Sequence, residues 1–302
     1  MQEKIALDVR PSVSKLLTGS IDYAGLFPPS AVSMSEAVLN YATYRNSNYS
    51  WMLGRFVVTA GRLSEFAEVA GDFLSRDAEG WHIAAVAGES IAASFDAIRE
   101  FNAHGTAAVC DVAEIKALSP EQIYSVAENM PTGITAYFEC PVNDDLDQMI
   151  AAIGETGQRA KIRTGGITAD AFPTSQAIVR FVQACTAANV PFKATAGLHH
   201  PIRCFRPLTY ESDAPTGTMH GFLNLFLMTG FAREGYRAAV LEDLMEEEFE
   251  EVLSFDTSSA KWRDEYTLNL NQIERLRTYG IQSFGSCSFD EPVADLQALG
   301  IL

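Results

Sequence analysis

Two lysines lie in short apolar segments, where a charged side chain is costly unless it has a partner or a function. Lys161 belongs to RAKIRTGG and Lys193 to PFKATAG, and both segments have the length and character of buried strands. Side chains alternate along a strand, so the apolar Ile162 and Phe192 take the face opposite the two amines. Because these apolar side chains should pack against helices, both amines are expected on the inner face of the sheet.

Such a pair of lysines suggests Schiff-base chemistry. Attack on a carbonyl needs a neutral amine, whereas the pKa of a free lysine is about 10.4. Burial and a second nearby cation both lower that pKa, and Lys161 has Arg163 in the same strand and Lys193 in the next one. Two other roles stay open for the lysines: an ion-pair network with Glu139 and Asp111, or a non-covalent site for a substrate carboxylate or phosphate.

The segments KIRTGG and KATAGL resemble the strand-six and strand-seven signatures of deoxyribose-phosphate aldolases, which are class I aldolases of the (β/α)8 fold. The resemblance implies that Lys161 is the Schiff-base lysine, that Lys193 lowers its pKa, and that Asp111 in VCDV serves a proton relay. The chain departs from that family in having Arg163 where the family has small residues, and in a long segment at 198–280. DYAGLFPP, FKATAGLHHP and FGSCSF also resemble a bacterial protein family, a resemblance that supplies no activity.

Other polar residues lie at predicted strand ends or in the loops that follow them. Glu139, Asp111 or a histidine would shuttle protons, while Arg163 and Arg203 would bind the anionic group of a substrate. A histidine pair stands where the aldolases continue a glycine-rich phosphate-binding turn. The remaining substrate-binding candidates are Asp22, Arg55, His199, His200 and Ser286.

Two further hypotheses come from different classes of function. A metal-dependent hydrolase or isomerase would use His199, His220 and Glu139, because histidine and carboxylate ligands suit zinc or manganese. A non-catalytic barrel would bind a small anion or a partner. The aldolase hypothesis, by contrast, implies no organic cofactor and no metal. Cys287 is either a thiolate near cationic groups or a small residue packed at the barrel mouth.

The elements that would position these residues alternate between short apolar runs and amphipathic segments, which predicts a largely parallel α/β sheet. We expect a single (β/α)8 TIM barrel, with an open doubly wound sheet as the competing fold. In such a barrel the acting residues lie at the carboxyl ends of the strands. The expected strands are 21–27, 51–58, 81–88, 106–112, 134–142, 159–166, 191–197 and 281–289.

The segment from about 198 to 280 is longer than a simple barrel needs between its seventh and eighth strands. It is expected to be a helical insertion within one domain that spans residues 1–302. An apolar helix is predicted around MHGFLNLFLMTGFA and an acidic helix over LEDLMEEEFEEV. The apolar side of the acidic helix would carry Leu241, Leu244, Met245, Phe249 and Val252.

Composition limits the partners and the compartment. The net charge of −17 argues against nucleic acid and anionic membranes as partners. The partner that the lysine pair and the aldolase resemblance imply is a small anionic carbonyl substrate. Five cysteines without a C-x-x-C spacing favour a reduced, cytoplasmic setting. The first 17 residues have no apolar signal region, and no long apolar run is present. We therefore expect a cytoplasmic protein, and a homo-oligomer is compatible with the sequence.

Overall fold

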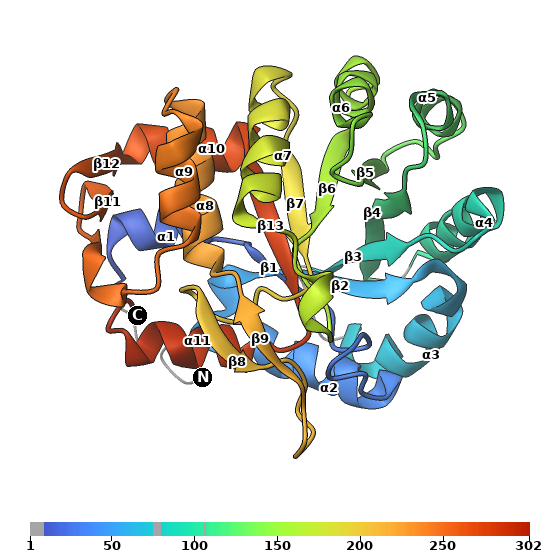
Figure 1. Cartoon of the computed structure of the whole chain (residues 1–302). Helices are drawn as coiled ribbons and strands as arrows, with labels where there is room; N and C mark the ends of the chain where they lie inside the picture. The colour runs from blue at the N-terminus through green and yellow to red at the C-terminus, as the bar shows by residue number, and fades with distance from the viewer. Residues whose placement is uncertain (1–8, 75–79, 106) are drawn as a thin grey trace.

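The computed structural model describes residues 9–74, 80–105 and 107–302. Eight parallel strands close into a barrel in the order β1–β13–β7–β6–β5–β4–β3–β2, so the predicted (β/α)8 fold is confirmed and the open sheet is wrong. Helices surround this barrel on its outside (Figure 1). The barrel strands are β1 (Ile21–Tyr23), β2 (Leu53–Thr59), β3 (Trp81–Val86), β4 (Ala108–Lys116), β5 (Thr135–Glu139), β6 (Arg159–Arg163), β7 (Phe192–Thr195) and β13 (Ile281–Ser286).

The helices begin where the sequence supplies caps. Ser33 accepts a hydrogen bond from the backbone N–H of Glu36, and Ser119 accepts one from the N–H of Gln122, in a helix that has Pro120 at its first position. None of the helices in the described ranges is long and apolar enough to cross a membrane. The helices outside the insertion are α1 (Pro11–Leu17), α2 (Met34–Arg45), α3 (Leu63–Leu74), α4 (Ile91–Ala103), α5 (Pro120–Glu128), α6 (Leu146–Glu155), α7 (Ser175–Ala187) and α11 (Asp290–Ala298).

Strand β4 differs most from its predicted bounds. It continues to Lys116, four residues past the predicted end, because Ala113 and Ile115 keep alternating with polar residues and pair with β5. The predicted start at Thr106 lies outside the described residues. Most other strands end earlier than predicted; β1, for example, ends at Tyr23 because the chain turns, with the N–H of Phe27 donating to the carbonyl of Ala24.

The interior of the barrel contains an apolar layer separate from the core under the helices. Val57, Ala84, Val112 and Tyr137 form this small cluster, whereas their neighbours along each strand belong to the outer core. Alternation then places the polar residues two positions further along these strands on the same inner face. Glu114, which follows Val112 in this way, therefore faces the lumen.

The insertion confirms the predicted apolar helix but contains more strand than expected. Its helices are α8 (Phe222–Arg233), α9 (Ala238–Met245) and α10 (Leu270–Tyr279), and α8 is buried from Phe222 to Ala232. An antiparallel hairpin, β8 (Cys204–Pro207) with β9 (Thr216–Met219), projects from the body of the molecule (Figure 1). A second antiparallel sheet consists of β10 (Leu253–Phe255), β11 (Ser259–Trp262) and β12 (Tyr266–Asn269).

The prediction of one acidic helix through Val252 is wrong. Helix α9 ends at Met245, and Phe249, which was expected on its apolar face, is 63% exposed. The chain leaves the helix because Glu247 turns inward and accepts hydrogen bonds from Trp262 Nε1 at 3.0 Å and Arg263 Nε at 2.9 Å. A buried carboxylate with two donors is stable there, whereas a helical continuation would not bring it to them.

Candidate active site inside the barrel

One carboxylate inside the barrel binds both lysines that the sequence singled out. Lys161 Nζ lies 2.7 Å from Glu114 Oε2, and Lys193 Nζ lies 2.5 Å from Glu114 Oε1. The two lysines are direct partners in the β6–β7 register, and Glu114 reaches them from β4 across the lumen. All three side chains are buried, so the structure brings the lysines together through a residue that the sequence analysis did not select.

Two further carboxylates complete the cluster. Asp22 Oδ2 on β1 lies 2.5 Å from Lys193 Nζ, and Glu139 Oε2 on β5 lies 2.9 Å from Lys161 Nζ. Asp22 also accepts a hydrogen bond from Ser283 Oγ at 2.7 Å. The cluster thus holds three carboxylates against two ammonium groups, and its net charge is −1 when all are ionised.

The carboxylates decide the protonation of the lysines. Burial by itself would lower the pKa of Lys161, but attraction to Glu114 and Glu139 outweighs burial and raises that pKa above its ordinary value. The same holds for Lys193 with Asp22 and Glu114. For Glu114, burial would raise the pKa, but the two lysines lower it to about 2. In the resting protein the pKa of Lys161 is therefore raised rather than lowered, because of its two carboxylate partners, and the expected effect of Lys193 on that pKa stays a prediction.

A cavity lies beside Glu139, the partner of Lys161. The side chain of Glu139 is 25% exposed and lines a cavity of about 590 Å³ together with Lys116, Asn143 and Arg163. The cavity lies at the carboxyl ends of β5 and β6, and Glu139 is the residue that both lines it and binds Lys161. Arg163 forms no ion pair with any residue in the described part of the chain, so its guanidinium is available in the cavity.

Asp111, the predicted proton relay, belongs to a different cluster. Its carboxylate receives two hydrogen bonds from the Arg55 guanidinium, at 2.7 and 2.8 Å, and lies 3.0 Å from His82 Nδ1. The ladder between β3 and β4 is irregular beside Asp111, and the residue lies three positions nearer the start of β4 than Glu114. Asp111 and Arg55 therefore pair with one another near the amino-terminal halves of their strands. Arg55 also touches the lysine cluster, because its backbone N–H donates a hydrogen bond to Asp22 Oδ1 at 2.8 Å.

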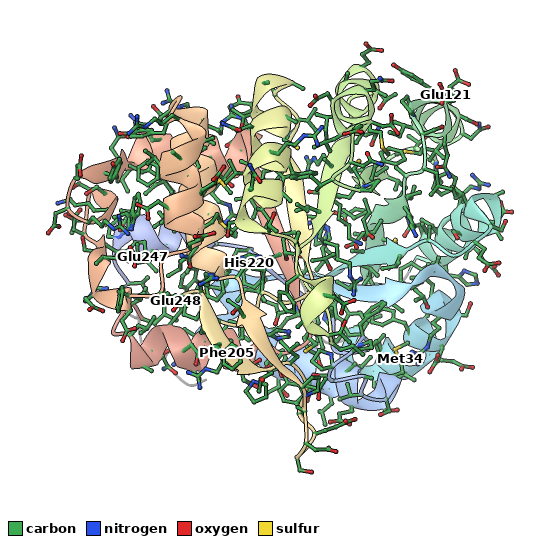
Figure 2. The ribbon with its side chains drawn as sticks, in the orientation of Figure 1. Met34, Glu121, Phe205, His220, Glu247 and Glu248 are labelled. Carbon is green, nitrogen blue, oxygen red and sulfur yellow. The ribbon has the colours of Figure 1, made fainter. Side chains whose placement is uncertain are left out.

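The histidines and Arg203 also have partners outside the lysine cluster. His200 Nδ1 lies 2.6 Å from Asp295 Oδ2, and Arg203 forms an ion pair with Glu248. Figure 2 shows His220 where the hairpin meets α8, and its Nε2 lies 2.8 Å from the carbonyl oxygen of Pro173.

These positions count against the metal hypothesis. His199 Nδ1 lies 3.3 Å from Glu291 Oε2, whereas Glu139 binds Lys161 and His220 binds backbone. Within residues 9–74, 80–105 and 107–302, no group of three or more His, Cys, Asp and Glu side chains is arranged to hold a metal ion. The side chains of His199, His220 and Glu139, the three proposed metal ligands, thus each have a different partner and are not brought together.

The loops after β6 and β7 lie directly against one another at the barrel mouth. Gly197 has φ +74°, and a Cβ placed there would lie 2.6 Å from the Phe172 ring and 2.9 Å from the Cα of Gly165. A Cβ on Gly165 would likewise lie 2.5 Å from Phe172. The glycines of RTGG and TAGL are therefore needed for this close backbone approach, which fixes the ends of both lysine-bearing strands.

Two residues of the cluster, Glu114 and Ser283, were missed by the sequence analysis. The signal for Glu114 was the continued alternation in AEIK after the predicted strand end; Ser283 had no signal beyond its place in the last strand. Ser286, a predicted binding residue, is buried at the end of β13, where its Oγ accepts a hydrogen bond from the backbone N–H of Ser288 at 3.4 Å.

No protein-family model matches this chain, and no curated protein matches its sequence. The evidence for function is therefore the site itself and the fold that carries it. The closed parallel barrel is compatible with an aldolase-like enzyme.

Proposed function

We propose that this protein is a lyase of class I aldolase type, in which Lys161 forms a Schiff base with a small carbonyl substrate that bears a phosphate or a carboxylate. The observation that carries the proposal is the binding of both lysines to Glu114 inside the barrel. Schiff-base chemistry needs an amine, groups that move its proton, and a water-poor site, and the cluster has all three.

Lys161 is the better nucleophile of the two. It lies next to Glu139, whose side chain reaches the cavity, so a carbonyl carbon entering there approaches Lys161 first. Lys193 is 1% exposed and is held between Asp22 and Glu114. Lys193 would remain an ammonium group throughout and act on Lys161 by its charge.

The resting pKa values require a proton transfer before attack. The Lys161 ammonium contacts two acceptors, Glu114 and Glu139, and one of them would take its proton as substrate enters. Loss of the Lys161 charge also removes one of the two cations that hold the pKa of Glu114 low, so Glu114 becomes a stronger base at that moment. The transfer is therefore internal to the cluster.

The remaining steps balance within the site. The neutral amine adds to the carbonyl carbon, and the carbinolamine loses water when a protonated carboxyl group of the cluster gives its proton to the departing hydroxyl. A carboxylate then takes the proton of the substrate's β-hydroxyl group, the carbon–carbon bond breaks, and its electron pair moves to the iminium nitrogen as an aldehyde leaves. The resulting enamine takes up a proton on carbon, and water hydrolyses the iminium to release the second product.

In this proposal Glu114 takes the relay role expected of Asp111, because Glu114 contacts both lysines and Asp111 is held by Arg55. Arg163 would bind the anionic group of the substrate, since it lines the cavity and has no ion-pair partner among the described residues, whereas Arg203 is paired with Glu248. A purely anion-binding barrel is less well supported, because the lysine charges are already outnumbered by carboxylates.

The test is reductive trapping. The protein is incubated with small aldehydes and ketones bearing phosphate or carboxylate, reduced with borohydride, and analysed by intact mass and peptide mapping. We expect one adduct per chain, at Lys161, that is lost in Lys161→Arg. Lys116 lines the same cavity and is the matched control, so Lys116→Arg should keep the adduct. No adduct across the panel, or an adduct that maps to Lys116, would sink the covalent mechanism.

A further inference from the structure

A second group of ionisable side chains surrounds Cys287, the residue directly after β13. Cys287 Sγ lies 3.9 Å from His199 Nδ1 and 3.7 Å from the hydroxyl oxygen of Tyr210. Glu291 Oε2 in turn lies 3.3 Å from His199 Nδ1 and accepts a hydrogen bond from the Tyr210 hydroxyl at 3.1 Å. The lysine mechanism uses none of these four groups.

This cluster is reachable from outside although Cys287 is buried. Cys287, Tyr210 and Glu291 line a cavity of about 390 Å³. His199 lines a second cavity, of about 230 Å³, that shares Tyr210 and Glu291 with the first. A small molecule in these cavities would therefore meet the sulfur atom with the imidazole beside it.

The charges around the sulfur favour an ion pair. Burial by itself would raise the pKa of Cys287, but His199 and the hydroxyls of Ser30 and Tyr210 outweigh burial and lower that pKa. Burial would lower the pKa of His199, but its contacts with Cys287 and Glu291 raise it to about 9. The charged or titratable groups that face Cys287 from the surrounding elements are Tyr23, Tyr44, His199, Tyr210, Asp290 and Glu291.

We propose that Cys287 and His199 form a thiolate–imidazolium pair that is a modification site for small neutral peroxides. The thiolate sulfur attacks one peroxide oxygen, a sulfur–oxygen bond forms and the oxygen–oxygen bond breaks. The departing hydroxide takes the proton of the His199 imidazolium and leaves as water, so cysteine is oxidised to sulfenic acid and the peroxide is reduced. Two molecules of a small thiol reverse the change, giving back the Cys287 thiol, one disulfide and water.

The surroundings of each cysteine favour reaction at Cys287, and the charges beside its cavity favour neutral reagents. Burial raises the pKa of Cys110 and of Cys140 to about 12, and Cys185 is more strongly affected. Cys204 is only half-buried, but burial raises its pKa as well. Asp290 and Glu291 beside the cavity repel anions, so neutral reagents should react faster than anionic ones of similar size.

The first experiment alkylates the native protein with iodoacetamide between pH 5 and 10 and locates the label by peptide mass. We expect Cys287 to be labelled first, with the midpoint of its rate against pH below 9. Relative to free cysteine, iodoacetate should react several-fold more slowly than iodoacetamide. His199→Gln should move the midpoint upward by a unit or more, whereas Cys204→Ser, the matched control, should leave it unchanged.

The second experiment exposes the protein to hydrogen peroxide and traps sulfenic acid with dimedone. Dimedone should add to Cys287 in the wild-type protein and far less in His199→Gln. Labelling of Cys204 first, a wild-type midpoint at or above 9, or an unchanged midpoint in His199→Gln would each overturn the proposal. The wild-type profile decides the question even where a variant does not fold.

Discussion

At the scale of single residues, Glu114 is the carboxylate that contacts both lysines of the candidate active site. It binds Lys161 at 2.7 Å and Lys193 at 2.5 Å, and its own burial is tolerable only because both lysines are charged. Removing its charge therefore affects two amines at once. Asp111, three positions earlier on the same strand, offers a carboxylate of the same chemistry with different partners.

A comparison of Glu114 with Asp111 tests which carboxylate moves protons in the proposed mechanism. Glu114→Gln should lower kcat by about 100-fold or more, since it removes a group that moves protons in the proposed mechanism. Asp111→Asn should keep kcat within a few-fold, because its partners are Arg55 and His82. Steady-state kinetics on a substrate found by trapping measures both. Equal losses in the two variants would contradict the assignment of the relay to Glu114.

The stability of the protein should depend on Glu114 at acid pH. Its pKa is about 2 in the folded protein and 4.5 ordinarily, so the folded state binds fewer protons between these values. The contribution of Glu114 is therefore fully present above pH 4.5 and is lost as the pH falls through about 2. Urea unfolding should show a steeper fall in the free energy of unfolding between pH 5 and 3 for wild type than for Glu114→Gln. Replacing the exposed Glu68 by Gln should leave the slope nearly as in wild type.

The sequence predicted the inward position of both lysines and selected Asp22 and Glu139, but it selected Asp111 where the structure has Glu114. Lys161 and Lys193 alternate with strongly apolar neighbours, so their inward direction follows from the strand period alone. Glu114 was missed because the strand was expected to end at residue 112, two residues before it, and the irregular pairing beside Asp111 breaks the period within β4. Such an irregularity depends on the neighbouring strand and leaves little local trace.

At the scale of elements, the contact between the loops after β6 and β7 positions the lysines. The backbones of Gly197 and Gly165 lie so close together that neither residue has room for a Cβ atom, and the ring of Phe172 packs against both. Positive φ and a crowded Cβ position act together at Gly197, whereas Gly157 has φ +69° and open space around it. A comparison of Gly157 with Gly197 therefore separates the cost of a positive φ from the cost of a crowded Cβ position.

We expect Gly157→Ala to lower the free energy of unfolding by about 1–2 kcal/mol, the cost of a left-handed conformation for a residue with a Cβ. Gly197→Ala should cost more than that and should also reduce trapping at Lys161, because Phe172 must move. Denaturant unfolding and borohydride labelling measure the two effects. Equal destabilisation, with trapping unchanged, would mean that the loop contact does not hold the site.

The insertion shows what periodicity does not reveal about an element. The apolar helix α8 was predictable because it is hydrophobic on all sides and is buried. The end of α9 was not, because it depends on Glu247 meeting Trp262, 15 positions later in the chain. A helix pattern predicts the face of a helix, whereas a distant partner decides where that helix stops.

At the scale of the whole molecule, the net charge of −17 should slow the approach of an anionic substrate. The Debye length falls from about 30 Å at 0.01 M to about 10 Å at 0.1 M ionic strength, so salt screens this repulsion. We expect kcat/KM for an anionic substrate to rise several-fold over that range and to stay flat for a neutral analogue. A fall with salt would instead mean that Arg163 and Lys116 near the cavity dominate the encounter.

The barrel was correctly predicted from eight strand–helix units, although periodicity alone does not distinguish a closed barrel from an open sheet. Closure rests on β1 pairing with β13, where Ile21 meets Phe284 and Tyr23 meets Ser286. These residues lie near opposite ends of the chain, and the sequence pattern within either strand does not predict that the two strands pair. The alternation of elements limits the fold to a few parallel arrangements, and the handed twist of the sheet then allows the two ends to meet.

The ion pairs of the lumen have a mechanical consequence for this closed wall. Glu114 on β4 joins β6 and β7, and Asp22 on β1 joins β7, although β4 is neighbour to neither β6 nor β7, and β1 is not neighbour to β7. The cluster therefore links strands that share no backbone hydrogen bonds, through side chains inside the barrel. If the backbone hydrogen bonds between β1 and β13 break, β1 stays tied to β7, on the far side of β13, through the ion pair of Asp22 with Lys193. Together with the pairing of β1 and β2, this ion pair would keep the first strand in place.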